Sequence, residues 1–588
     1  MPAALPDLAR VWQRRLASQL HRFFHIAPLP GAWLHGTLTT APMAASLIAV
    51  TAFTGIQLGA MAVFGSLISL WNTGRSLRSR LRMYAAVAPI FPASMALGVW
   101  VGPHPPLAIA TQTLVIFLVA VAYHVFFLGP GPGPLHLLYA CAIGIYLGSS
   151  TDDGWPIVTV TAVSAALTAT LSLSDLLFRR HAPEREAITA ARAAVQDFLH
   201  AASSTGESGR HEERIRHLRH TATAAVDHAA SVLGAARSQH RPPGRVRHQL
   251  GRQLHQLHGQ LGTGALLQDY PGAPAHERSG PYPHPLGRPS ARYLLRRTFG
   301  GDPVRLPLLV GLRCAGAGLT AGVLALALHV GHSYWAVLSA TIVLHGGLDR
   351  GSTFLRAGHR LAGTLVGVLV ISAVEPLQPP PVLQLTIVIV AVWGMNLFLP
   401  RNYALAAGFI TVMTLQANIA ITSVDVTSCL VVQRVLATLI GVATALVVLV
   451  STGRRVPIRT AQRQLTRTLR ATTAALDHAA AGSSFTEEGR KTHRDLRFEV
   501  LACADLMPRL GADDRHLTRW HDVVHAVQQH AHAALAVSWH AAPTASNITA
   551  RTDEVRSLLE RVSALDHPRR TRRTEGAGTC CENGHCGP

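Results

Sequence analysis

Long apolar stretches separated by short polar turns fill two parts of the chain, residues 32–177 and 305–452. Stretches long enough to cross a bilayer, about 20 residues or somewhat fewer, predict about twelve transmembrane helices. We place them near 36–56, 58–73, 83–101, 107–128, 135–149, 156–177, 306–329, 334–347, 361–374, 382–399, 404–421 and 430–451. The pattern therefore predicts an all-α integral membrane protein with two six-helix halves.

The stretches 178–304 and 453–566 have a different pattern. Ala, Leu and Val recur there at helical spacing, with Arg, His and Gln on the opposite face. This is typical of amphipathic helices that pack together. We expect each transmembrane half to be followed by a helical cytoplasmic region. A basic cytoplasmic N-terminus over 1–31 and a disordered tail over 567–588 complete the expected organisation.

The arginines indicate the orientation. They cluster in alternate turns, at 75–82, 179–180, 350–356, 401 and 454–455, whereas the turns 102–106, 151–155, 331–333, 375–381 and 422–426 contain no Lys or Arg. Basic residues favour the cytoplasmic side of a membrane. We expect a multi-pass protein of the plasma (inner) membrane with both termini in the cytoplasm.

Composition narrows the function classes. The chain is 48% hydrophobic and 14% charged, and its net charge of +21 comes almost wholly from arginine. Beside a membrane, such charge favours contact with anionic headgroups, and without a recognisable motif we expect no nucleic-acid partner. No P-loop and no catalytic constellation occurs, so we predict neither an enzyme nor a cofactor. Histidine pairs such as His255 with His258 are expected by coincidence among 32 histidines, and no metal site is predicted.

Two pairs of similar sequence segments suggest internal repeats. A shift of 274 residues aligns Ala60–Met83 with Tyr334–Ala357, with six identities that include Arg82 and Arg356. Within the second half, RLAGTLVG at 360–367 shares its Arg, Thr and Gly with RVLATLIG at 434–441. The predicted topology gives these two segments opposite orientations. Inverted repeats nested within parallel ones are a plan found in transporters.

The motifs YWAVLSATIVL, GTLVG, RNYALAAGFITVMTL and RVLATLIG occur in this order between 306 and 455. This part of the chain resembles the fusaric-acid-resistance (FUSC) type aromatic acid exporter family. The resemblance implies an inner-membrane protein that exports aromatic carboxylic acids or related small organic anions as a homo-oligomer. The first half has the same expected arrangement of spans but lacks the family motifs, because Ala60 and Met61 occupy the positions that correspond to Tyr334 and Trp335. It can therefore be a scaffold.

Arginines supply the candidate substrate-binding groups. Arg313 and Arg434 lie inside predicted spans, where a charge is costly unless it is paired or faces water. Arg356 and Arg360, with His359 between them, lie at the predicted cytoplasmic mouth. They either anchor the helix at the headgroups or present a planar fork to a carboxylate.

Aromatic residues and the family motifs add further candidates. Tyr334 and Trp335 either form part of a headgroup belt or stack on an aromatic substrate. The resemblance adds Arg401, Asn402 and Tyr403 to the substrate-binding set.

Two residues are candidates for proton coupling. Asp425 either neutralises Arg434 or takes part in coupling, or else is simply solvated in an outer turn. His124 is either a proton relay or a hydrogen-bonded packing histidine. The GxxxG pairs at 318–322 and 363–367 indicate close helix packing.

Three functions remain open from the sequence. The first is a secondary exporter of small aromatic or organic acids, and the second is a passive organic-anion channel. The third is a non-transporting envelope scaffold or regulatory membrane protein whose cytoplasmic bundle binds a partner.

Overall fold

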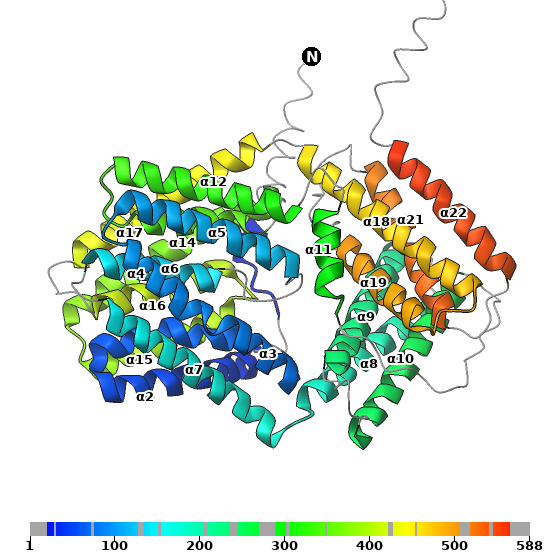
Figure 1. Cartoon of the computed structure of the whole chain (residues 1–588), viewed down its shortest axis with the longest axis horizontal. Coiled ribbons are helices and arrows are strands. Elements are labelled where there is room, and N and C mark those ends of the chain that lie inside the picture. Colours follow the sequence, from blue (N-terminus) through cyan, green and yellow to red (C-terminus); the bar gives the residue numbers. More distant parts are fainter. Residues whose placement is uncertain are drawn as a thin grey trace, which may run out of the picture. The chain divides into compact units, whose positions relative to one another are not determined.

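The computed structural model describes residues 20–28, 31–71, 74, 76–126, 135–150, 154–204, 209–235, 244–269, 288–300, 306–346, 350–420, 427–452, 455–504, 518–539 and 545–564. Within these ranges the regular structure is helical throughout (Figure 1). The chain divides into two compact units. The first combines Met1–Arg180 with Ala291–Gly453, and the second combines His181–Ser290 with Arg454–Pro588.

The first unit contains the apolar helices. Its elements are α2 (Ala32–Ser66), η1 (Leu67–Trp71), α3 (Leu77–Val87), α4 (Ile90–Val101), α5 (Pro105–Phe126), α6 (Leu135–Ser150), α7 (Trp155–Phe178), α11 (Ala291–Phe299), α12 (Leu306–Ala327), α13 (Ser333–Leu344), α14 (Arg350–Val374), η2 (Glu375–Leu377), α15 (Pro381–Phe398), α16 (Tyr403–Ile419) and α17 (Thr427–Ser451). In the described part of the chain, eight helices are long and apolar enough to cross a membrane, and three shorter apolar helices accompany them. The protein is therefore an all-helical, multi-pass membrane protein.

The first two predicted spans meet at a sharp break in α2. At Gly55 the backbone leaves the helical conformation, with φ 80° and ψ 171°, and glycine adopts such a positive φ without a steric penalty. The chain folds back there, because a Cβ atom added to Gly59 would lie 2.5 Å from the Thr51 Cα atom, and the Ser69 hydroxyl donates to the Thr39 carbonyl at 2.7 Å. The expected short turn between two antiparallel segments is therefore present. The part of α2 after Gly59, continued by η1, is almost entirely buried.

Glycines set the closest helix contacts. A Cβ atom added to Gly363 of α14 would lie 2.4 Å from the Ala404 carbonyl of α16, and one added to Gly98 of α4 would lie 2.3 Å from the Cys141 carbonyl of α6. Only glycine allows backbones to approach so closely. The pairs α14–α16 and α4–α6 are accordingly among the most extensive helix contacts of the unit, together with α2–α7, α5–α12, α12–α13, α13–α17, α15–α16 and α2–α15.

The second unit has two apolar cores. Its helices are α8 (Ala182–Ser203), α9 (Gly209–Ala235), α10 (Arg245–Asp269), α18 (Arg455–Ala480), α19 (Glu487–Ala504), α21 (Thr518–Trp539) and α22 (Ala545–Ala564). One core joins α8, α9 and α10, with Val195, Phe198, Val226 and Leu254 buried. The other joins α18, α19, α21 and α22, with Leu465, Val500, Val524 and Val555 buried. Both follow from apolar residues at helical spacing.

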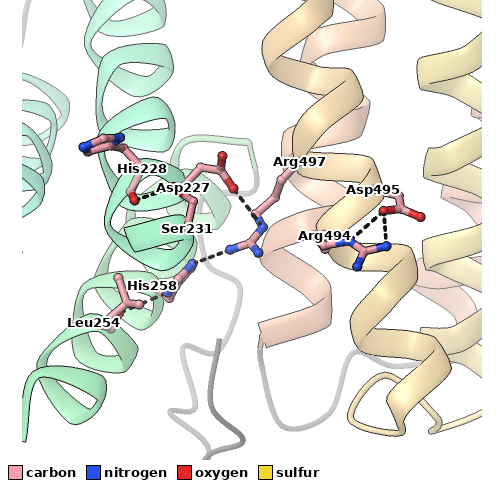
Figure 2. A network of polar contacts seen from close by, with 8 residues as sticks. All are labelled: Asp227, His228, Ser231, Leu254, His258, Arg494, Asp495 and Arg497. Atoms are coloured by element: carbon pink, nitrogen blue, oxygen red, sulfur yellow. Dashed lines mark hydrogen bonds and ion pairs between the residues drawn. The ribbon is translucent and has the colours of Figure 1, made fainter. Parts of the chain in front are cut away.

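A polar network joins these two cores (Figure 2). Arg497 of α19 lies with its Nε 3.4 Å from an Asp227 carboxylate oxygen of α9, and its Nη1 donates to His258 Nε2 of α10 at 3.3 Å. The His258 Nδ1–H donates to the Leu254 carbonyl at 3.0 Å. Burial first, and the Arg497 charge second, lower the pKa of His258 to about 3. His258 is therefore a neutral acceptor for Arg497 at physiological pH.

His255 and His258 thus stand in a structural setting. No group of three His, Cys, Asp or Glu side chains gathers as metal ligands in the part of the chain that the structure describes.

Candidate functional site

Arg434 and Trp335 form the centre of a buried cluster in the first unit. Each is only 1% exposed, and the Arg434 Cζ atom lies 4.6 Å from the Trp335 ring centroid. A guanidinium in this position is attracted by the negative face of the indole ring. The His332 ring also stacks on Trp335, with centroids 4.6 Å apart, and His332 is hydrogen-bonded to Gln433. The first turn of α13 and the middle of α17 are thereby tied together.

A second buried guanidinium lies near the first. Arg360 of α14 is 0% exposed. It lies within electrostatic range of the phenols of Tyr139 and Tyr403, and Arg434 is within range of Arg360, of these two phenols and of Tyr334. We call Arg360, Arg434, Trp335, Tyr139, Tyr334 and Tyr403 the arginine–tyrosine cluster. Its members come from five helices, α6, α13, α14, α16 and α17.

The cluster carries positive charge without a carboxylate partner among the described side chains. The phenols of Tyr139 and Tyr403 are hydrogen-bonding neighbours of Arg360, whereas Nε and Nη2 of Arg434 lack a hydrogen-bond partner. Among the described side chains of the first unit, the carboxylate is that of Glu375 in η2. Burying a charge without a partner is expensive. The arrangement is therefore suited to receive an anion.

Further buried polar atoms accompany the cluster. Ser339 Oγ of α13, Thr364 Oγ1 of α14 and both amide atoms of Gln416 in α16 lack hydrogen-bond partners. Thr364 lies one helical turn beyond Arg360. Buried polar groups are nearly always satisfied by protein, water or a ligand. These atoms thus extend the polar interior away from the two guanidinium groups.

The echoed motif builds this site. A Cβ atom added to Gly441 would lie 2.4 Å from the Ala336 carbonyl, so Gly441 lets α17 pack tightly on α13, where Arg434 meets Trp335. Gly363 and Gly367 do the same for α14 and α16, where Arg360 meets Tyr403. In each copy the arginine precedes the last glycine of the motif, Gly367 or Gly441, by two helical turns.

Three predicted substrate residues have other contacts. His359 Nε2–H donates to the Phe23 carbonyl at 3.0 Å, and Arg401 Nε donates to the Ala27 carbonyl at 3.1 Å. Asn402 caps α16, because its Oδ1 accepts from the main-chain N–H of residue 404 at 2.9 Å, and its Nδ2 donates to the Phe23 carbonyl at 3.1 Å. These three residues therefore hold an N-terminal segment of the chain.

Arg313 lies apart from the cluster, whereas Arg356 is within electrostatic range of Tyr403. Arg313 is buried in α12 and lies within electrostatic range of Arg350. Arg356 is partly exposed and donates to the Ser352 carbonyl at 3.2 Å and to its hydroxyl at 3.1 Å. The structure thus brings together five of the ten predicted substrate residues: Tyr334, Trp335, Arg360, Tyr403 and Arg434.

The structure gives separate outcomes for His124, Asp425 and the aromatic pair Tyr334 and Trp335. His124 Nε2–H donates to the His345 carbonyl at 3.0 Å, which ties α5 to the end of α13. Asp425 lies outside the described residues. Tyr334 and Trp335 are buried among protein groups, so the expectation of a headgroup belt is wrong for both.

Sequence reasoning missed Tyr139, His332 and Gln433. Tyr139 comes from α6, in the half that lacks the family motifs, and no spacing marks it. Gln433 directly precedes Arg434, and His332 lies two residues before Tyr334, so proximity in the sequence to predicted residues was the available signal.

Comparison with known proteins agrees with the motifs. Residues 320–448 match the family model described as fusaric acid resistance protein-like, which confirms the resemblance for this part of the chain. A stretch of 137 residues is 35% identical to an uncharacterized protein of Synechocystis sp., and it covers 23% of this chain and 18% of that protein. The chain thus matches less than a fifth of that relative's length. No solved structure matches the chain.

Proposed function

We propose that this protein is a transporter that exports small organic anions, aromatic carboxylic acids above all, across the inner membrane. One observation carries the proposal: two fully buried guanidinium groups, Arg360 and Arg434, lie within electrostatic range of each other without a described carboxylate partner. The match of residues 320–448 to the fusaric acid resistance protein-like family supports an export role.

The cluster has the chemistry to bind an aromatic acid. A guanidinium fork pairs with a carboxylate through two parallel hydrogen bonds, and these bonds are strong where water is excluded. The phenols of Tyr139, Tyr334 and Tyr403 add hydroxyl groups that can donate to an anion, and two of them, Tyr139 and Tyr403, are hydrogen-bonding neighbours of Arg360. The edges and faces of these aromatic rings lie beside the anion site and can pack against the ring of an aromatic substrate.

Two helix N-termini add to the positive potential. Helix α13 begins at Ser333 and α16 begins at Tyr403, so Tyr334, Trp335 and Tyr403 all lie in first turns. The N-terminal end of a helix carries a partial positive charge. Short helices whose N-termini point at an anionic substrate group are a recurrent feature of transporters.

For the architecture, we propose twelve spans in two six-helix halves, with inverted three-helix repeats inside the second half. The packing supports parallel halves, because Gly98 and Gly102 of α4 meet α6 as Gly363 and Gly367 of α14 meet α16. It supports the inverted relation as well: α12 packs on α13 as α15 packs on α16, and α13 packs on α17 as α16 packs on α14.

A comparison of corresponding positions supports transport by the second half. Met95 precedes Gly98 by three residues, as Arg360 precedes Gly363, and Met95 accepts a contact from the Thr161 hydroxyl at 3.1 Å. Helix α7 contains no basic residue at all. The first half thus supplies Tyr139 to the cluster and otherwise acts as a scaffold.

The proposal also includes the expectations about oligomeric state, cofactors, lipid contacts and topology. The chain works as a non-enzymatic homo-oligomer with no cofactor, its basic turns contact anionic headgroups, and both termini lie in the cytoplasm.

Counterflow of labelled benzoate in proteoliposomes tests the proposal. Arg434→Gln should reduce the counterflow rate about tenfold or more, since the carboxylate loses a charged fork. Arg313→Gln is the matched control, because it also removes a buried arginine, but one that lies apart from the cluster. Equal rates in wild type and Arg434→Gln would reject the site.

The same preparation separates the alternatives. Collapse of net export on addition of an uncoupler supports secondary export. Uncoupler-insensitive flux supports a passive organic-anion channel. A folded wild-type protein without any flux, which retains a partner through its cytoplasmic helices, supports the scaffold.

A further inference from the structure

Residues Leu20–Pro28, here called the N-terminal strap, consist of a helical end at 20–24 and the residues 25–28 after it, and they lie against α14 and the start of α16. The strap is held mainly through its main chain. The Phe23 carbonyl accepts from His359 at 3.0 Å and from Asn402 at 3.1 Å, and the His25 carbonyl accepts from Asn402 at 3.2 Å. Ala27 is bound from both sides, because its N–H donates to the Arg401 carbonyl and its carbonyl accepts from Arg401 Nε, both at 3.1 Å.

One side chain anchors the strap. The Phe23 ring meets the His359 ring edge to face, with centroids 4.6 Å apart, and also lies against Gly358. The next residue, Phe24, is 71% exposed and touches only Phe23 among the ring contacts of the described chain. The strap therefore docks by one ring and a set of carbonyls, and most of its surface stays open.

The docking residues adjoin the arginine–tyrosine cluster. His359 directly precedes Arg360 on α14, and Asn402 directly precedes Tyr403 at the start of α16. Arg360 and Tyr403 are within electrostatic range of each other. The strap thus bridges the two helix positions between which an anion would reach Arg360 from this end of the site.

We propose that Gly358, His359, Arg401 and Asn402 form a binding site for the main-chain carbonyls at the end of a helix and in the residues that follow it, and that the strap occupies this site as a gate over the cluster. While docked, the strap holds α14 and the N-terminus of α16 together and covers the approach to Arg360. Its release opens that approach. The gating role rests on the proposed transport function, but the docking site and its effect on access do not.

Two variants release the strap by different means. Asn402→Asp keeps a side-chain oxygen to cap α16, yet it removes the two donors to the strap and places a carboxylate against two carbonyls. Phe23→Ala removes the anchoring ring. Phe24→Ala is the matched control, because it deletes the same ring from the exposed neighbour.

The accessibility of the cluster can be measured by thiol labelling, which does not depend on transport. In full-length protein whose native cysteines are replaced by alanine, Thr364→Cys places a thiol one turn beyond Arg360. A membrane-impermeant thiol reagent is then applied from the side of the strap. Asn402→Asp and Phe23→Ala should raise the labelling rate about tenfold, as expected for the loss of roughly one to two net hydrogen bonds or an equivalent contact. Phe24→Ala should leave it unchanged.

Equal labelling rates in all variants would overturn the gate. If Phe23→Ala fails to fold, as judged by size-exclusion chromatography, Asn402→Asp decides alone. Benzoate counterflow on the same proteins separates the two proposals: faster labelling with no flux in any variant upholds the strap and rejects transport, whereas normal flux with unchanged labelling upholds transport and rejects the strap.

Discussion

The guanidinium of Arg434 lies over the indole ring of Trp335, with the Arg434 Cζ atom 4.6 Å from the ring centroid and both side chains buried. The two residues are 99 positions apart in the sequence, on α17 and α13. Their contact requires the close approach of these helices at Gly441. The charge of Arg434 is thereby held beside rings, without a described carboxylate to neutralise it.

Arg434→Lys tests whether the planar fork matters as well as the charge. Lysine keeps the positive charge but can neither pair with a carboxylate through two parallel bonds nor stack flat on Trp335. We expect the half-saturating benzoate concentration in counterflow to rise about tenfold. Arg350→Lys, at a partly exposed arginine that donates to the Val450 carbonyl, should have no such effect. An unchanged half-saturating concentration in Arg434→Lys would show that charge alone suffices.

Gly363→Ala should separate α14 from α16. Its new methyl group would lie 2.4 Å from the Ala404 carbonyl, and that backbone atom cannot move aside cheaply. Overpacking of this kind costs about 1–3 kcal/mol. Thermal unfolding in detergent should show the loss. Gly316→Ala in α12 is the control, because a methyl group there meets nothing within 4 Å. Equal unfolding temperatures for the two variants would contradict the packing.

Arg497→Ala should destabilise the second unit. The substitution leaves Asp227 without its ion pair and His258 Nε2 without its donor, in a setting where Arg497 itself is buried. Breaking such a pair from one side costs about 3–5 kcal/mol. Arg494→Ala is the control, since Arg494 lies on the same helix and bonds only to its neighbour Asp495 at 2.7 Å. Hydrogen exchange of α9, α10 and α19 measures the effect, and similar protection in both variants would rule out the bridge.

Acidification should weaken the same unit. Burial is the first cause that lowers the pKa of His258 to about 3, that of His493 to about 4, and that of His532 well below its ordinary value. The unfolded chain regains a pKa near 6.5 and therefore binds protons that the folded unit does not. The stability due to these neutral histidines is complete above pH 6.5 and falls as the pH drops toward the folded pKa.

Each of these histidines should contribute a slope of about 1.4 kcal/mol per pH unit below pH 6.5. Denaturant titrations of the full chain between pH 8 and pH 5, followed by hydrogen exchange of the second unit, measure the combined slope. His258→Gln should reduce it. Stability that stays constant from pH 8 to pH 5 would show that these side chains are protonated in the folded protein or are solvated.

The membrane class and the family motifs were predictable because bilayer length and arginine placement are local properties of the sequence. Arg434 was also predictable as a candidate, since a charge within an apolar span is costly wherever it lies, whereas Arg360 was predicted at the cytoplasmic mouth and is instead fully buried. Their proximity to each other and to Tyr139 was not predictable, because it depends on how α6, α14 and α17 meet in space. Arg401 and Asn402 carried a family signal for substrate, but their donors are directed at the N-terminal strap.

Two other misses have physical reasons. The counterpart of GTLVG in the first half is GVWVG at 98–102, which a 274-residue shift does not align, because α3 and α4 are separate helices where α14 is continuous. The strap gave no sequence signal, since its bonds use main-chain carbonyls that every residue possesses.

Equilibrium binding of labelled benzoate to the purified full-length protein tests the central claim most directly. The comparison is between wild type and the Arg360→Met, Arg434→Met double variant, which retains the volume of both side chains without their charge. We predict saturable binding to wild type that competing carboxylates displace, and none to a double variant that elutes as a folded species. Equal saturable binding to both proteins would contradict the account.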